Sequence, residues 1–330
     1  MASIDRAAIG WSLGVSLFAV FISIFGANLQ SMDNQSIPTH DDVVHSDVFF
    51  TLQGDDAVGS VMGFSVQAGP KMTYVSVLDY LILATSSASD TVFAFDTDEN
   101  LLAEIDVGKT PKGVKIHPEG KIAFVANENS GTVGIIDLNS FEMTGEIQVG
   151  NVPHNIIFNN DGNTAFVTIQ GEDKIAIIDV SSSQVIDYIS VEKFPHNLDL
   201  SSDGRFLYVA NIGTNDVAVI DLQTNKITKR ISVSTGHHGI DVSPDGKQIY
   251  VSGIGSDKVN IINADSLELI KQVVVGEGPH GIRADSYSEK LYVAVTKTDE
   301  IVVIDLQTLE IIKRSNLGKT PFWITISGNS

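Results

Sequence analysis

The chain has 330 residues, with 41 Asp or Glu against 21 Lys or Arg, so its formal net charge is −20 at pH 7. This charge argues against nucleic-acid binding, because a phosphate backbone has to be met by clustered Lys and Arg side chains. The sequence contains no cysteine, which excludes disulfides, thiol catalysis and thiolate metal sites.

Near the N-terminus, residues 7–27 form an apolar run without a single charged side chain. As a helix this run would span ~31 Å, about the thickness of the hydrocarbon core of a bilayer. It therefore predicts a retained transmembrane anchor, with a cleaved signal peptide and secretion as the alternative. Arg6 precedes the run, and no Lys or Arg follows it until Lys71. By the positive-inside tendency, residues 1–6 stay in the cytoplasm and the rest of the chain is exported.

The segment after the predicted anchor, residues 28–46, is polar and contains Pro38 and several Asp. Such composition is typical of a spacer between a membrane and a folded domain. The predicted organisation is therefore a cytoplasmic N-terminus (1–6), a membrane segment (7–27), a spacer (28–46) and one folded domain (47–330). The predicted location is the cell membrane, with the folded domain outside the cytoplasm.

A repeat of 42 residues runs through the folded domain. It is marked by a Phe-Val or Tyr-Val dipeptide at every step, beginning at Phe124, Phe166, Tyr208, Tyr250 and Tyr292. Each unit holds four short runs of β-branched and aromatic residues, separated by turn formers and without a helical period. Four strands in about 42 residues predict one blade of a β-propeller, so the fold class is all-β.

The number of blades follows from the first strand of each unit. Seven such strands open at Lys71, Lys112, His154, His196, His238, His280 and Phe322. The last unit stops after one strand, and residues 46–66 resemble the third and fourth strands of the unit at 256–276. We therefore predict that the N-terminal segment completes the last blade, which closes the ring and hides its edges. Its second strand is not evident, residues 37–46 being one candidate, so six blades is the alternative.

The amino-acid sequence of the repeats resembles that of the YVTN-type β-propeller family. The segments SPDGKQIYVSG (243–253) and KLYVAVTKTDEIVVIDLQT (290–308) carry this resemblance, which extends over about residues 47–330. It implies an exported or cell-surface propeller. Proteins of similar architecture include lactonases and propeller domains that hold copper or haem, so the resemblance implies the fold without selecting an activity.

A ladder of histidines is the main candidate for a site. His154, His196, His238 and His280 are 42 residues apart, so they occupy one level on four consecutive blades, with His237 beside them. First strands line the central channel of a propeller, and this level is expected at a solvent-filled mouth. Imidazole suits copper or zinc, which makes a metal site one hypothesis.

Two alternatives compete with the metal hypothesis. The histidines can be structural, with their ring nitrogens bonded to backbone carbonyls of the neighbouring blade, and we favour this interpretation. The other blades carry Lys71, Lys112 and Phe322 at the same level. Lysine and histidine together at a channel mouth could also capture a small anion.

Other recurring polar residues are expected to be structural. Asp96, Asp137, Asp179, Asp221 and Asp305 end a strand in five of the units, where a carboxylate caps a turn by accepting bonds from backbone N–H groups. His117 occupies the position of Ser243 in its turn and is expected at the surface. Neither a Gly-x-Ser-x-Gly elbow nor a His-Glu-x-x-His motif occurs in the sequence.

Three functions follow, in order of preference. The first is a membrane-anchored binding or scaffold module that presents a rigid face to a protein, glycan or surface-layer partner. The second is a copper- or zinc-binding, or electron-transfer-associated, propeller that uses the channel histidines. The third is a lactonase-like hydrolase, which lacks the convergent carboxylates that would hold a metal at the channel. We expect a binding protein rather than an enzyme.

Overall fold

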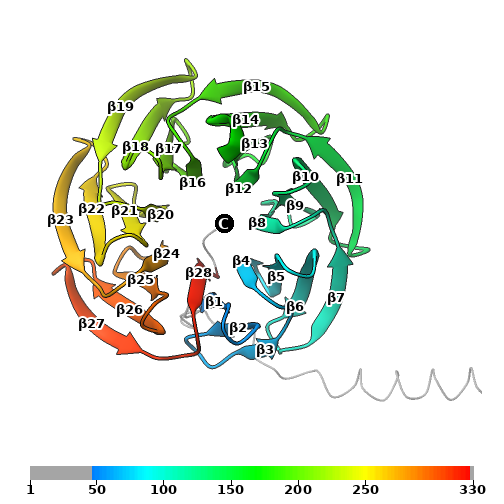
Figure 1. The fold of residues 1–330 in the computed structure, drawn as a ribbon, viewed down its shortest axis with the longest axis horizontal. Helices are drawn as coiled ribbons and strands as arrows, with labels where there is room; N and C mark the ends of the chain where they lie inside the picture. Colours follow the sequence, from blue (N-terminus) through cyan, green and yellow to red (C-terminus); the bar gives the residue numbers. More distant parts are fainter. Residues whose placement is uncertain (1–46, 328–330) are drawn as a thin grey trace, which may run out of the picture. The chain divides into compact units, whose positions relative to one another are not determined.

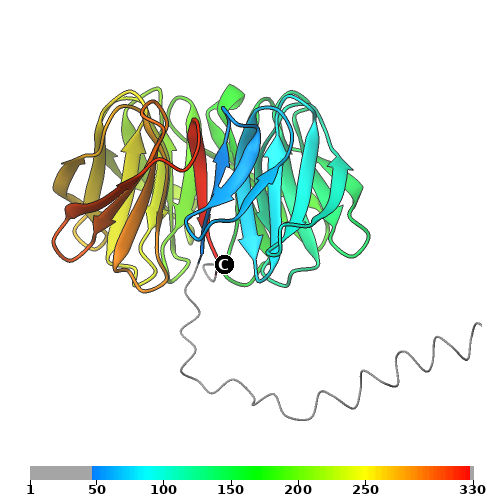
Figure 2. The same ribbon diagram turned by 90° about the horizontal axis from the view of Figure 1, so that it is seen from below.

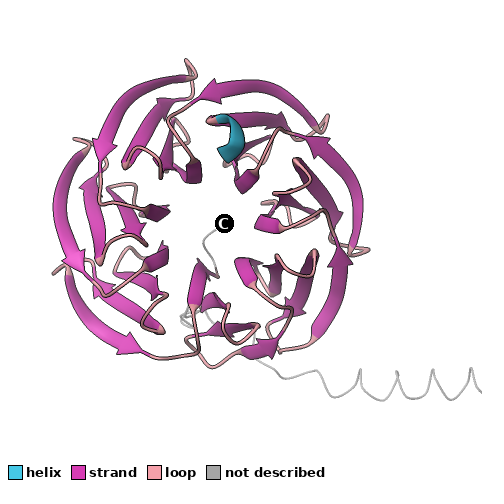
Figure 3. Ribbon diagram, viewed as in Figure 1, coloured by secondary structure: helices cyan, strands magenta, loops and turns pink. Residues whose placement is uncertain are grey.

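The computed structural model describes residues 47–327, which form seven four-stranded antiparallel sheets arranged around a central channel (Figure 1). This arrangement confirms an all-β propeller and decides for seven blades over six. Within the described residues the one helical element is the short 3-10 turn η1 (Gln170–Glu172) (Figure 3).

The strands are grouped by their place in the blade. The innermost strands, which line the channel, are β4 (Met72–Leu78), β8 (Pro111–Ile116), β12 (Pro153–Phe158), β16 (Pro195–Leu200), β20 (His237–Val242), β24 (Pro279–Ala284) and β28 (Pro321–Ile326). The second strands are β5 (Leu81–Ser86), β9 (Ile122–Asn127), β13 (Thr164–Ile169), β17 (Phe206–Asn211), β21 (Gln248–Gly253), β25 (Lys290–Val295) and β1 (Val48–Leu52). The third strands are β6 (Thr91–Asp96), β10 (Thr132–Asp137), β14 (Lys174–Asp179), β18 (Asp216–Asp221), β22 (Lys258–Asn263), β26 (Glu300–Asp305) and β2 (Ala57–Ser60). The outermost strands are β7 (Leu101–Asp106), β11 (Glu142–Gln148), β15 (Gln184–Ser190), β19 (Lys226–Ser232), β23 (Glu268–Val274), β27 (Glu310–Ser315) and β3 (Ser65–Gln67).

The position of a strand in its blade decides its burial. Second strands are almost wholly buried, as in β13, because both faces pack against the neighbouring blades. Outermost strands expose most of their side chains, as in β11 and β23. The core is therefore a set of apolar layers between adjacent blades. Each layer is buried only when the blades on both of its sides are present.

The ring closes where the two ends of the domain meet. Strand β28 pairs with β1, with Phe50 opposite Ile324 and Val48 opposite Ile326, and the blade continues through β2 and β3 (Figure 2). Closure by N- and C-terminal strands is thus confirmed, but the assignment of residues 46–66 was wrong, because they supply the second, third and fourth strands. Residues 37–46 are not needed as the second strand. The strands β2 and β3 have only 4 and 3 residues, so three strands fit where two were predicted.

The recurring aspartates cap turns, as predicted. Both Asn139 and Ser140 donate their backbone N–H to Asp137, at 2.8 and 2.9 Å. Asp305 accepts in the same way from Gln307 and Thr308. These carboxylates hold the turns between third and outermost strands.

His117 does not lie at the surface as predicted but is buried. Its Nε2 donates to the carbonyl oxygen of Gly162 at 3.0 Å, and its Nδ1 accepts from the N–H of Glu119 at 3.1 Å. Gly162 belongs to the next blade, where a Cβ would meet the imidazole of His117. The histidine therefore links two adjacent blades.

The described residues contain no helix that is long and apolar enough to cross a membrane. The predicted N-terminus (1–6), anchor (7–27) and spacer (28–46) lie outside the described residues, so these assignments stay predictions.

Candidate functional site

The two ends of the channel carry different side chains. All seven innermost strands run in the same direction, so their second residues share one level and their fifth residues share another. We call the level of Lys112, His154, His196, His238, His280 and Phe322 the histidine end. The opposite end, around Lys115 and Arg283, is called the cavity end. Of His237 and His238 only the backbone is described.

The pairing register corrects one predicted member of the histidine level. Met72 pairs with Ser86 as Pro111 pairs with Asn127, which places Thr73 at the level of Lys112. Lys71 lies one residue before β4, exposed, with φ 58°. The alignment of Lys71 with the histidines was therefore wrong, because the first blade has a different spacing between its first two strands.

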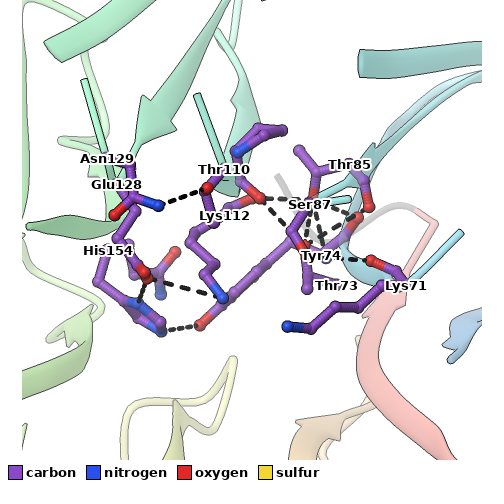
Figure 4. A network of polar contacts seen from close by, with 12 residues as sticks. Lys71, Thr73, Tyr74, Thr85, Ser87, Thr110, Lys112, Glu128, Asn129 and His154 are labelled. Carbon is purple, nitrogen blue, oxygen red and sulfur yellow. Dashed lines mark hydrogen bonds and ion pairs between the residues drawn. The ribbon is translucent and has the colours of Figure 1, made fainter. Parts of the chain in front are cut away.

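The histidine end is filled by aromatic side chains from the blades without a histidine. The Tyr74 side chain is 1% exposed, and its ring lies 4.4 Å, centroid to centroid, from Trp323. Its hydroxyl lies 3.0 Å from His154 Nε2 and donates to Asn197 Oδ1 at 3.0 Å. Burial strongly raises the pKa of Tyr74, so the hydroxyl keeps its proton. Figure 4 shows Tyr74 reaching toward His154 from its own blade.

Further bonds connect this centre to neighbouring blades. The Asn197 oxygen also accepts from Asn155 Nδ2 at 2.7 Å, and Asn197 Nδ2 lies 2.8 Å from His196 Nδ1. His280 donates from Nδ1 to the carbonyl oxygen of Phe322 at 2.9 Å, and the two rings stack with centroids 3.7 Å apart. The bonds around Tyr74, His154 and Asn197 link three blades, those of β4, β12 and β16. The His280–Phe322 bond links two more, those of β24 and β28.

The arrangement of the three described rings bears on the metal hypothesis. His154, His196 and His280 are 7%, 6% and 1% exposed, so they do not line a solvent-filled mouth. Among the residues that the structure describes, no group of three His, Asp or Glu side chains is placed to hold a metal. The observed His280–Phe322 bond is of the structural kind that we favoured, whereas a copper or zinc site stays a prediction.

An acidic residue between two blades sets the charge at this end. Glu128 Oε2 lies 3.4 Å from His154 Nδ1 and 3.6 Å from Lys112 Nζ (Figure 4). Burial opposes ionisation of Glu128, yet His154 and Lys112 together hold its pKa below the ordinary value. Burial also lowers the pKa of His154. Lys112 is thus paired within the protein, which weakens the prediction that it captures an outside anion.

The cavity end carries a second ladder of residues, which was not predicted as a site from the sequence. In six of the seven innermost strands the fifth residues follow a 42-residue step and are Lys115, Ile157, Asp199, Asp241, Arg283 and Thr325. They line a cavity of ≈ 570 Å³, which the turns after the innermost strands surround. This volume lies within the range of small-molecule sites. The regular step of these charged positions was visible in the sequence.

Arg283 holds the two carboxylates of this level. Its Nη1 pairs with Asp241 Oδ1 and lies 3.4 Å from Asp199 Oδ2. The carboxylates also accept backbone bonds from the next blade along the chain, Asp241 from Ala284 N at 2.6 Å and Asp199 from Val242 N at 2.9 Å. All three charged groups are therefore fixed by the protein itself.

Lys115 differs from these three residues. Among the described residues, no carboxylate lies within ion-pair distance of its ammonium, and no hydrogen-bond acceptor contacts it. Burial, with a contribution from Arg283, lowers the pKa of Lys115 to about 8. Burial, with a contribution from Asp199, raises the pKa of Asp241 to about 7, although Arg283 opposes this shift. The cavity thus contains one lysine without a partner and one carboxylate that titrates near neutral pH.

Known proteins share this fold. Solved structures with the same architecture include a functionally unknown protein from Desulfotomaculum acetoxidans (TM-score 0.73, 14% identity, covering 85% of this chain and 98% of that one). A candidate 6-phosphogluconolactonase from Bacteroides fragilis has a TM-score of 0.73 and 18% identity over 88% of this chain and 99% of that one. Hydrazine synthase from Kuenenia stuttgartiensis has a TM-score of 0.66 and 19% identity over 74% and 86%. At these identities the likeness is one of fold alone.

A comparison with curated protein sequences finds no match. The sequence profile of a family described as YNCE-like β-propeller matches residues 92–289. This match covers more than half of the chain and agrees with the YVTN-type resemblance of its repeats. The chain is a member of the YNCE-like β-propeller family.

Proposed function

We propose that this protein is a binding protein that takes up its ligand in the cavity at one end of the propeller channel. The observation that carries the proposal is the contrast between the two ends. The histidine end is filled by Tyr74 and Trp323, which pack on each other. The cavity end holds ≈ 570 Å³ of space beside the unpartnered Lys115.

Two features favour binding over hydrolysis. A lactonase-like hydrolase needs a carboxylate that is free to act as a base or to hold a metal. Both carboxylates in the described lining, Asp199 and Asp241, are instead held by Arg283 and by backbone N–H groups. A rigid, pre-formed pocket of this kind suits recognition, because little ordering entropy is lost when the ligand binds.

The propeller is further proposed to be displayed outside the cytoplasm by an anchor at residues 7–27. The support is the uncharged run and the absence of Lys and Arg from the following segment up to Lys71. The partner on the cell exterior would then be a glycan, a protein or a surface-layer component. Retention of the whole chain in membranes after an alkaline carbonate wash tests this anchor.

The binding function is tested by ligand-observed NMR on residues 47–330, with a defined panel of sugars, sugar acids, amino acids and dicarboxylates. At least one class is expected to give saturation-transfer signals. The substitution Ser202→Trp should abolish them, because Ser202 is exposed and lines the cavity. Ser266→Trp, an exposed serine in a turn outside the lining, is the matched control and should leave the signals intact. Signals that are equally strong with Ser202→Trp, or no signal from any class, would contradict the proposal.

A further inference from the structure

The unpartnered ammonium of Lys115 sets the chemistry of the cavity. Lys115 is half-buried at the cavity wall. An ammonium that has lost part of its water gains from a negatively charged partner, because this desolvation is otherwise uncompensated. The second cation, Arg283, already faces Asp199 and Asp241. Among the charged groups of this level, only Lys115 is therefore available to an anion from outside.

The charge sum favours an anion with a single charge. With all four groups ionised, Lys115 and Arg283 balance Asp199 and Asp241, so the level is neutral before a ligand enters. A monoanion would leave one negative charge, whereas a dianion would leave two beside fixed carboxylates. The net charge of −20 on the whole chain repels polyvalent anions further.

Polar groups in the lining have unused hydrogen-bonding capacity. Asn159 uses its Oδ1 to accept from Thr164 N, whereas its Nδ2 has no partner among the described residues. The hydroxyls of Ser202 and Thr325 also make no hydrogen bond within residues 47–327. Unpaired polar groups that line a cavity favour a ligand that supplies hydroxyls.

One side of the same lining is apolar. Ile157 and Phe158 are each 7% exposed and both border the cavity. A pyranose ring presents C–H groups on its faces and hydroxyls at its rim, so it can meet both kinds of wall. These features together describe a hydroxylated ring with one acidic group.

On the basis of the proposed binding function, we propose that the cavity recognises a hydroxylated monocarboxylate of sugar size, with its carboxylate on Lys115. The same chemistry occurs in a free sugar acid and in the acidic unit of a glycan. The inference specifies the ligand class, and it can fail while the binding function stands.

The charged groups predict how affinity depends on pH. At pH 6 Lys115 is charged and Asp241 is mostly neutral, because their pKa values are about 8 and about 7. Above pH 8 Lys115 is mostly neutral and Asp241 is ionised, so the level has lost one positive charge and gained one negative charge. The other strands packed around this level present Ser76, Ile157 and Thr325, which do not titrate. A carboxylate ligand should therefore bind more weakly as pH rises from 6 to 9.

The test is isothermal titration of residues 47–330 with D-glucuronate, D-glucose and an aldobiouronic acid, a disaccharide in which one glucuronate is linked to a neutral sugar. Glucuronate should bind at least about 10-fold more tightly than glucose at pH 6, a ratio equivalent to about 1.4 kcal/mol. The variant Lys115→Met should remove this preference, while Lys121→Met should keep it. Lys121 is an exposed lysine that is paired with Glu119 and does not line the cavity. Binding of the aldobiouronic acid as well would assign the site to the acidic unit of a glycan, and binding of glucuronate alone to a free sugar acid.

A second variant keeps the test meaningful if Lys115→Met lowers stability. Lys115→Arg should retain the preference and lose part of its decline with pH, because arginine stays charged to pH 12 and beyond. Equal binding of glucose and glucuronate, with no effect of Lys115→Met, would overturn the inference and leave the binding function intact. The inference would also be overturned, and the binding function left intact, if none of the three probes bound while the NMR panel found another ligand class whose binding Ser202→Trp abolishes. Failure of the probes and of the whole panel would overturn both.

Discussion

A chain that starts at Pro70, without β1–β3, should aggregate instead of forming a smaller propeller. Three of the four strands of the closing blade are lost, so β28 and the adjacent faces become exposed. The lost segment contributes Val48, Phe50 and Leu52, each at most 4% exposed, to a cluster with Ile324 and Ile326. An exposed apolar strand edge is a template for pairing between chains.

Size-exclusion chromatography and thermal unfolding measure this effect. The control is a chain that starts at Asp47, which keeps every described strand and should be monomeric and stable. A milder variant, Phe50→Ala, should lower the free energy of unfolding by about 3–5 kcal/mol, because a buried aromatic side chain leaves a cavity. A chain from Pro70 that is monomeric, with the melting temperature of the control, would show that the ring does not depend on this closure.

Tyr74→Ala should be the most damaging single change at the histidine end, with a loss of about 3–5 kcal/mol in unfolding free energy. The substitution removes a buried ring from between Trp323 and His154. Tyr74→Phe retains the ring but removes the hydroxyl, which leaves His154 Nε2 and Asn197 Oδ1 with one bond fewer. Its expected cost is about 1–3 kcal/mol.

Urea unfolding at pH 7.5 compares these variants. Tyr80→Phe is the matched control, since Tyr80 is 71% exposed, and surface substitutions usually stay within about 0.5 kcal/mol. If Tyr74→Phe unfolds at the same urea concentration as Tyr80→Phe, the hydroxyl network does not stabilise the channel.

Most of the propeller could be predicted because blades repeat the same local chemistry. Alternating apolar residues, Asp-capped turns and a constant 42-residue step are local signals, and each of them is present in nearly every blade. The closing blade was misassigned because β2 and β3 are too short to show this alternation. His117 was misplaced for another reason, since its burial depends on Gly162 of the next blade.

The state of the channel could be predicted only in part. Sequence spacing puts the histidines at one level but cannot show what lies across the ring. Tyr74 and Trp323, from blades without a histidine, fill that space and make a solvent-filled mouth into a packed one. The charged residues at the cavity end are different, because the 42-residue step from Asp199 to Asp241 to Arg283 is present in the sequence and predicts that they share one level. What could not be predicted is that Arg283 pairs with both carboxylates and leaves Lys115 without a partner.

The channel is packed at the histidine end and open at the cavity end. The chain has no cysteine, so a single introduced thiol reports the accessibility of its own site. Thr325 lines the cavity, whereas Thr73 lies at the level of the histidines. The variants Thr325→Cys and Thr73→Cys therefore form a matched pair. The measurement is the rate of modification by a small methanethiosulfonate reagent. We expect Thr325→Cys to react at least about 10-fold faster, whereas equal rates, or faster modification of Thr73→Cys, would contradict the account.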